Sequence, residues 1–218
     1  NADAAGLWQF IPGTGKLWGL VVNKDIDERF HVEKSTRAAV RMLKSLRETY
    51  GSWSLAAAAY NTGQANINKV LKDQGANNYY DLFLNRETRN YVFQIVVMKE
   101  ILEHPRKYGY ALADKDFYKP YDAGTQKINL KGPISNLAQW AKDHGTNYKT
   151  VRWLNFWIMK YVLPEGMWEI LLPADLKLGD WKSDSSQSVR QANFADTASA
   201  AKQILYTVKP GDNLSTIA

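Results

Sequence analysis

The sequence predicts a mainly α protein in which a helical domain is followed by a small α+β unit. Three observations lead to this expectation. Apolar residues recur at spacings of three and four from residue 1 to about 105. No alternating pattern typical of strands interrupts that half. Between residues 128 and 174, two short helical patterns lie between two strand candidates.

The first two predicted helices have clear end signals. Ser35 or Thr36 is expected to cap the first, and Gly51 ends it because glycine readily adopts the left-handed conformation there. Ser52 or Ser54 begins the second, which continues through an alanine run narrow enough for another helix or a ligand to approach closely. The apolar face of the first helix consists of Val40, Leu43, Leu46 and Tyr50.

Two further helices complete the domain, for which we expect the bounds 1–110. Gly75 closes the third helix, and Pro105 forbids continuation of the fourth. The apolar positions are Ile67, Val70 and Leu71 in the third helix and Tyr91, Ile95, Met98 and Leu102 in the fourth.

Residues 111–127 are predicted to be a polar, tyrosine-rich connector, and residues 128–174 a β-α-α-β unit. Its first strand candidate lies near residues 128–130, and its closing strand near residues 169–172. The two short helices carry Leu137, Trp140 and Ala141, and then Tyr148, Val151 and Leu154.

The last part of the chain contains an internal repeat. Residues 175–203 are poor in apolar side chains and are predicted to be a flexible linker. In residues 204–218, Asn213–Ala218 matches Asn136–Ala141 in residue type and follows a similar strand candidate. We therefore expect the start of a second, truncated β-α-α-β unit.

Composition narrows the function classes. The net charge of +6 and pI near 9.3 favour an acidic partner, but the basic residues are scattered, which is typical of a solvated basic surface and does not favour nucleic acid. The three histidines lack metal-ligand spacing. No apolar run approaches the roughly 20 residues that span a bilayer. Residue 1 is not methionine and no signal segment follows it, so we expect a fragment of a longer protein.

Four segments together carry a family resemblance. They are Ala4–Pro12, Asp27–Arg29 with Glu33–Thr36, Ala58–Gly63, and Arg86–Val92. In this order and spacing they resemble the lysozyme-like catalytic domain shared by lytic transglycosylases and goose-type lysozymes, most closely the membrane-bound lytic transglycosylase D type. Residues 128–174 resemble a divergent LysM unit. The tail, with Gly211, Asp212, Asn213 and Leu214, resembles the opening of a LysM module, which binds N-acetylglucosamine polymers.

The resemblance implies cleavage of the β-1,4 bond between N-acetylmuramic acid and N-acetylglucosamine, with formation of a 1,6-anhydromuramic end. A single glutamic acid held neutral would protonate the leaving oxygen, and no cofactor or metal is implied. In the family that glutamate lies shortly before the Gly-Leu-Trp-Gln segment, which here begins at Gly6. None of the five residues before Gly6 is glutamate. The catalytic residue is therefore expected upstream of Asn1, and the chain as written is expected to be inactive.

The remaining cleft residues are assigned to substrate binding. The resemblance implies that Gln9, Tyr60 and Asn61 contact the glycan. Trp8 and Phe10 flank Gln9 and are also assigned to substrate binding. Trp8 either stacks on sugar or fills the core. Glu87 has three interpretations: a substrate ligand, a helix N-terminal partner of an arginine, or a substitute acid. Tyr91, four residues on, shares its face and is predicted to form a cleft wall.

Three functions remain open at this stage. They are a lytic transglycosylase whose acid lies elsewhere, a non-catalytic protein that binds peptidoglycan, and a muramidase of the goose lysozyme type. The expected partner is the peptidoglycan glycan strand, with no nucleic acid and with membrane contact only through an upstream anchor. We expect a monomer in the cell envelope, exported and either periplasmic or associated with the outer membrane.

Overall fold

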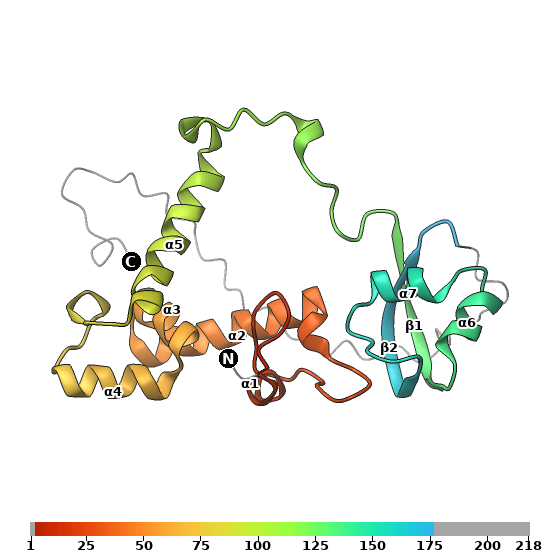
Figure 1. Ribbon diagram of the computed structural model, residues 1–218, viewed down its shortest axis with the longest axis horizontal. Helices are drawn as coiled ribbons and strands as arrows, with labels where there is room; N and C mark the ends of the chain where they lie inside the picture. Colours follow the sequence, from red (N-terminus) through yellow and green to blue (C-terminus); the bar gives the residue numbers. More distant parts are fainter. Residues whose placement is uncertain (1–2, 177–218) are drawn as a thin grey trace. The chain divides into compact units, whose positions relative to one another are not determined.

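The computed structural model describes residues 3–176, which form a helical part and a β-α-α-β unit (Figure 1). The mainly α fold class is thus confirmed. The α-helices of the first part are α1 (Pro12–Leu17), α2 (Val32–Tyr50), α3 (Trp53–Thr62), α4 (Gln64–Gln74) and α5 (Arg86–Glu103). Four short 3-10 helices span Glu28–Phe30, Tyr79–Asp81, Pro105–Tyr108 and Asp114–Asp116 in the described residues.

The core of the helical part forms around α3. Its alanines at positions 56, 58 and 59 are fully buried, and the small side chains let α2 and α5 approach closely. Larger side chains fill the space around them. They are Leu46, Leu55, Ile67, Tyr79, Leu82, Leu84 and Val92.

Most helix ends follow their local signals. Gly51 and Gly75 adopt left-handed conformations, with φ of 72° and 62°, after α2 and α4. Ser52 caps α3 because its hydroxyl oxygen accepts a hydrogen bond from the Leu55 amide. These ends confirm the predictions from glycine and serine placement.

The cap predicted at Ser35 or Thr36 is wrong. Helix α2 begins about one turn earlier, at Val32, and Ser35 is buried within it with its hydroxyl donating to the Val32 carbonyl. The preceding residue, His31, stacks on Trp157 of the β-α-α-β unit, with ring centroids 5.6 Å apart. A tertiary contact therefore accompanies a helix start that the local signal missed. The predicted face is also partly wrong, since Val40 is 41% exposed while Ala38 and Ala39 are buried.

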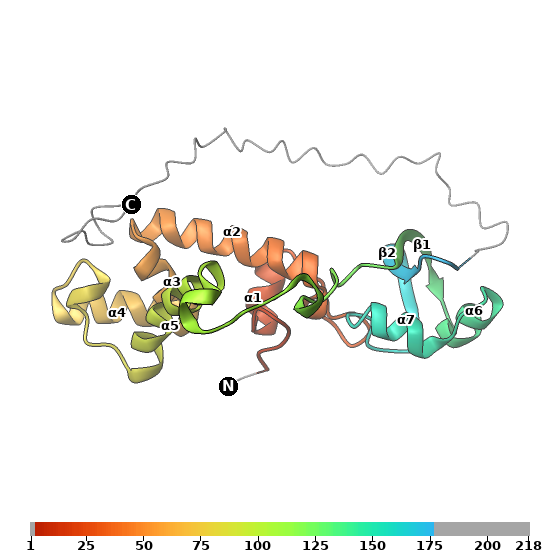
Figure 2. The ribbon, with the colours of Figure 1, turned by 90° about the horizontal axis from the view of Figure 1, so that it is seen from above.

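The second part is a two-stranded antiparallel sheet with two helices on one side (Figures 1 and 2). Its elements are β1 (Thr125–Ile134), α6 (Leu137–Asp143), α7 (Tyr148–Leu154) and β2 (Leu163–Pro173). Ile128 pairs with Ile170, and Leu130 with Trp168, so alternate side chains of both strands enter one core. The predicted β-α-α-β order is confirmed, with strands longer than expected.

One residue of this second core comes from the helical part. Ile26 is 0% exposed and packs in the same cluster as Leu137, Trp157 and Ile158. Ile26 also forms an isolated antiparallel bridge with Ile158.

Asn155 holds the end of α7 against the sheet. Its side chain is buried, its amide group donates to the carbonyls of Val151 and Leu171, and its carbonyl oxygen accepts from the Leu171 amide.

A buried backbone group left without a partner costs about 1–3 kcal/mol. We expect Asn155→Ala to lower the free energy of unfolding, measured by urea denaturation, by about 2 kcal/mol. The exposed strand residue Asn129 is the control, since Asn129→Ala should change it by less than about 0.5 kcal/mol. Equal effects would contradict this assignment.

The tail lies outside the described residues. The predicted linker beyond residue 176, the strand candidate after residue 204 and the predicted glycan-binding residues 211–214 therefore stay predictions. Within residues 3–176, no helix is both long enough and apolar enough to cross a membrane.

Candidate functional site

The Gln9 loop, which we define as residues 5–10, is a tight turn closed by its own backbone. The Ala5 amide donates to the Phe10 carbonyl at 3.1 Å, and the Gln9 amide donates to the Gly6 carbonyl at 3.3 Å. Gln9 has a positive φ of 50°, uncommon for a residue with a side chain. Its side-chain amide also donates to the Gly6 carbonyl, at 2.8 Å. The loop therefore presents an exposed Gln9 whose side chain is already oriented.

Tyr60, at the end of α3, ties this loop to the helical core. Its hydroxyl donates to the Trp8 carbonyl at 2.7 Å, and its ring meets those of Trp8 and Phe10 edge to face, at 6.4 and 6.2 Å. Burial and, secondly, the neighbouring Tyr91 raise the pKa of Tyr60 above its usual range. Tyr60 is therefore a neutral hydrogen-bond donor at physiological pH.

Asn61 and Glu87 meet where α3 ends and α5 begins. The Asn61 amide group donates to Glu87 Oε1 at 3.4 Å, and its carbonyl oxygen accepts from the Thr88 hydroxyl at 2.9 Å. Asn85 caps α5 by accepting from the Thr88 amide. Glu87 thus lies exposed in the first turn of a helix. This setting suits a ligand for amide and hydroxyl groups better than a general acid, which needs an apolar site.

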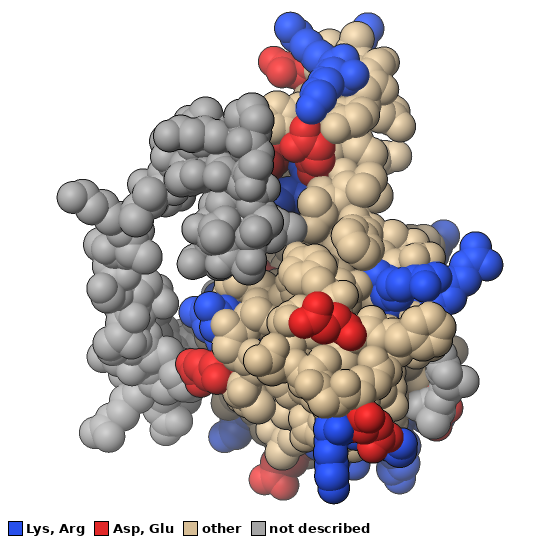
Figure 3. All heavy atoms as spheres, turned by 90° about the vertical axis from the view of Figure 1, so that its left-hand side faces the viewer, with Lys and Arg blue, Asp and Glu red and all other residues tan. Residues whose placement is uncertain are grey.

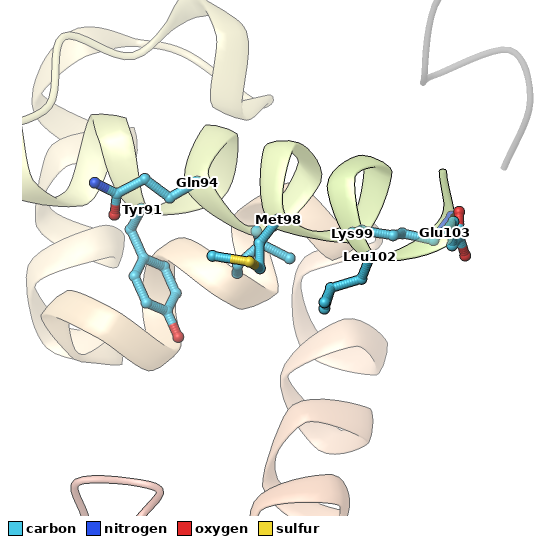
Figure 4. A pocket seen from close by; sticks show the side chains of 7 residues that line it. Tyr91, Gln94, Met98, Lys99, Leu102 and Glu103 are labelled. Atoms are coloured by element: carbon cyan, nitrogen blue, oxygen red, sulfur yellow. The ribbon is translucent and has the colours of Figure 1, made fainter. Parts of the chain in front are cut away.

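A groove of about 570 Å³ continues from Tyr91 along α5 (Figure 4). It is lined by Tyr91, Gln94, Ile95, Met98, Lys99, Leu102 and Glu103. Tyr91, Met98 and Leu102 project from the same side of the helix (Figure 4). Burial raises the pKa of Tyr91, so its hydroxyl is also neutral. The predicted cleft wall therefore borders a largely apolar surface.

The two aromatic residues beside Gln9 are placed differently. Phe10 is 3% exposed and belongs to a core cluster with Leu20, Ala38 and Ala39. Its burial corrects the expectation of direct sugar contact and makes Phe10 a support for Tyr60 instead. Trp8 is half-buried, and its indole N–H donates to the Thr36 hydroxyl at 2.8 Å. Only the remaining part of its ring is available for stacking.

A buried ion pair lies behind the Gln9 loop. Both nitrogens Nε and Nη2 of Arg29 donate to the Asp27 carboxylate, at 2.9 and 2.7 Å. Arg29 Nη1 donates to the carbonyls of Asp3 and Phe10. The hydrogen bond to Asp27 is the main reason that the pKa of Arg29 is raised, while burial opposes it.

Comparison with known proteins agrees with this arrangement. Residues 1–83 match the transglycosylase SLT domain. Residues 126–175 match the C-terminal LysM-like domain of soluble lytic transglycosylases. The residues matched to the SLT domain include the Gln9 loop, Tyr60 and Asn61. Glu87 and Tyr91 lie after the end of that match.

Two relatives extend the similarity. The whole chain is 30% identical over 227 residues to the membrane-bound lytic murein transglycosylase D of Escherichia coli strain K12 and covers 49% of it. A 74-residue stretch, 34% of this chain, is 32% identical to a putative tributyltin chloride resistance protein of an Alteromonas species and covers 36% of it. The chain thus spans about half the length of the lytic transglycosylase it matches. The resemblance to that family, carried by the four motifs and the LysM-like unit, is confirmed.

The structure brings most of the predicted SLT site residues together. Trp8, Tyr60 and Tyr91 form one group, and Asn61 and Glu87 another at the adjoining helix ends. Thr88 is buried and orients Asn61, and its only sequence signal was its place in the Arg86–Val92 motif. The sequence predicts that Asp27, Glu28 and Arg29 tie a loop, and the structure confirms this for Arg29, although no sequence signal indicated which carbonyls it binds.

Proposed function

We propose that this chain forms the glycan-binding cleft of a peptidoglycan lytic transglycosylase that cleaves between N-acetylmuramic acid and N-acetylglucosamine with formation of a 1,6-anhydromuramic end. The observation that carries the proposal is the convergence of the Gln9 loop, Tyr60 and the Asn61–Glu87 pair within an SLT domain. The proposed substrate places the protein in the cell envelope.

The groups in this cleft match the chemistry of an N-acetylated sugar. Gln9 and Asn61 offer amide groups that can bind N-acetyl and hydroxyl groups. Glu87 is an exposed acceptor, and Tyr60 and Tyr91 stay neutral. On the face shown in Figure 3, the Lys and Arg side chains form small separate groups, with uncharged and acidic residues between them, and no continuous basic patch of the kind that favours a polyanion is seen there.

We propose that the general acid is supplied from outside residues 1–218. The four motifs contain four carboxylates. Asp27 and Glu33 form ion pairs with Arg29 and Lys127, and Glu87 is exposed at a helix N-terminus. Glu28 is buried, but one of its oxygens pairs with Lys34 and the other accepts from the Val21 amide at 2.8 Å. None of the four lies in the apolar site that protonation of a glycosidic oxygen requires.

The groove along α5 is where we propose that the acid-bearing segment packs. Beyond Tyr91, the helix exposes Ile95, Met98 and Leu102 in this groove, each at least 46% accessible. An amphipathic helix laid on these side chains would bury them and place its own residues beside Tyr60 and Tyr91.

Digestion of purified peptidoglycan tests the function. We expect the 218-residue chain to bind peptidoglycan sacculi in a pull-down assay without releasing soluble products. A longer gene product that carries the glutamate expected upstream of Asn1 should release muropeptides with anhydro ends. Mass spectrometry distinguishes these ends because they are one water molecule lighter than hydrolysed ends. Hydrolysed ends would instead show a muramidase, and the absence of cleavage by the longer product would favour the non-catalytic binding protein.

Glu87 is tested in the same assay. If the 218-residue chain itself released anhydro ends, the external acid would be wrong, and loss of release in Glu87→Gln would identify Glu87 as the acid. Under the proposal, Glu87→Gln in the longer product should weaken substrate binding while retaining cleavage.

A further inference from the structure

We propose that the LysM-like unit, residues 125–176, is a positioning part of the SLT cleft and holds the Gln9 loop in place through Ile26, Asp27 and Arg29. The role of the Gln9 loop in glycan binding rests on the function proposed above, whereas the mechanical connection does not. The connection has three steps.

The first step is the insertion of Ile26 into the LysM-like core. Ile26 is 0% exposed and is the one member of that described cluster from outside residues 125–176. The backbone continues the contact on both sides of it. The Asp27 amide donates to the Trp157 carbonyl, and the Met159 amide donates to the Asp25 carbonyl, each at 2.8 Å. The LysM-like unit therefore binds this SLT loop through main chain and core packing together.

Side chains around the insertion extend the interface. His31 stacks on the Trp157 ring with an interplanar angle of 22°, and the Lys34 ammonium lies 5.9 Å from that ring's centroid. Lys127 of β1 forms an ion pair with Glu33 of α2 at 2.8 Å. These contacts fix the LysM-like unit to the loop and to the start of α2, which a unit on a free tether would not show.

The second step runs from Asp27 to Arg29. Asp27, whose amide donates to the Trp157 carbonyl, also binds Arg29 through its carboxylate. The side chains of Asp27 and Arg29 are both less than 10% exposed. Burial in a low-dielectric setting makes this pair directional and costly to separate.

The third step runs from Arg29 to the Gln9 loop. Arg29 Nη1 donates to the Phe10 carbonyl at 3.0 Å, and that carbonyl also accepts the Ala5 amide that closes the loop. Gly6 lies so close that a Cβ atom there would be 1.9 Å from the Arg29 carbonyl oxygen. Displacement of Arg29 would therefore release the turn that orients Gln9.

Amide hydrogen exchange of the 218-residue chain tests the connection directly. In Ile26→Ala, the amides of Ala5 and Gln9 should exchange about tenfold faster or more, because a tenfold change corresponds to a loss of only about 1.4 kcal/mol of local stability. Amides of α4, far along the chain from the interface, should keep their rates. The matched control is Ile170→Ala, which removes an equally buried isoleucine of the same core that belongs to β2 and not to the inserted loop. It should leave the exchange rates of Ala5 and Gln9 unchanged.

A second variant, Asp27→Asn, tests the connection in case Ile26→Ala unfolds the protein as a whole. Asp27→Asn keeps the side-chain size and the backbone contact with Trp157, but weakens the hold on Arg29. It should accelerate exchange at Ala5 and Gln9 while the LysM-like amides keep their rates. Unchanged exchange at Ala5 and Gln9 in both variants would overturn the proposal.

Glycan binding separates this inference from the proposed function. Calorimetry with an N-acetylglucosamine hexasaccharide should show weaker binding in Ile26→Ala and Asp27→Asn, and unaltered binding in Ile170→Ala. If exchange at Ala5 and Gln9 accelerates while hexasaccharide binding stays the same, the LysM-like unit stabilises the Gln9 loop but does not position the cleft for glycan. If the unaltered chain binds no hexasaccharide, the proposed function fails while hydrogen exchange still decides the connection.

Discussion

Replacement of Arg29 by alanine is expected to lower the free energy of unfolding by about 3–5 kcal/mol. The substitution leaves the Asp27 carboxylate buried without its partner, and burial of an uncompensated charge is the costly part. It also removes the donor to the carbonyls of Asp3 and Phe10. Urea denaturation followed by circular dichroism measures the change.

The control is an ion pair of the same type on the surface. Lys69 and Asp73 are one helical turn apart on α4 and are both more than half exposed. Lys69→Ala should change stability by less than about 1 kcal/mol, because solvent screens exposed pairs. The double substitution Asp27→Asn with Arg29→Met should recover part of the loss, since no charge then remains buried. If Arg29→Ala costs no more than Lys69→Ala, the pair does not hold the Gln9 loop.

Local signals predicted those parts of the fold that depend on the local chain. Gly51, Ser52 and Gly75 set helix ends through backbone conformation or a cap three residues away, and these ends were read correctly. The α2 start was not read correctly. His31, the residue before this helix, stacks on Trp157 of a unit more than 90 residues later in the sequence, and no local signal indicates such a contact. Ile26 shows the same limit: an isolated apolar residue in a polar loop has no periodicity to indicate which core it enters.

The candidate site divides in the same way. The motifs identified Gln9, Tyr60, Asn61 and Glu87, and the structure brings their elements together. An aromatic residue type alone does not show whether its ring lies in the core or faces the cleft. The structure distinguishes the two by burial, since Phe10 is buried and Trp8 is half-buried. Thr88 and Arg29 act through hydrogen bonds to other site residues, and such roles depend on geometry that the sequence order does not contain.

Gly6→Ala is expected to cost about 3 kcal/mol or more and to abolish glycan binding at the cleft. Gly6 has a φ of 75°, and a residue with a side chain in that region carries about 1–3 kcal/mol of strain. The added Cβ would also lie 1.9 Å from the Arg29 carbonyl oxygen, a backbone atom that cannot move aside alone. The turn must therefore open or Arg29 must shift, and either change displaces Gln9.

Gly13 provides the matched control for this substitution. It lies in α1 without a positive φ, and a Cβ there would meet nothing within 4 Å. Gly13→Ala should leave stability unchanged or raise it by up to about 1 kcal/mol, since alanine restricts the unfolded chain and favours the helix. Both variants are measured by denaturation and by hexasaccharide calorimetry. The chemical change is the same in each, three residues before Gln9 in Gly6→Ala and four residues after it in Gly13→Ala. Loss of binding in Gly6→Ala alone would show that the conformation of the turn matters, because proximity to Gln9 is nearly the same in both. Equal binding by the two variants would mean that the Gln9 loop is not part of the cleft.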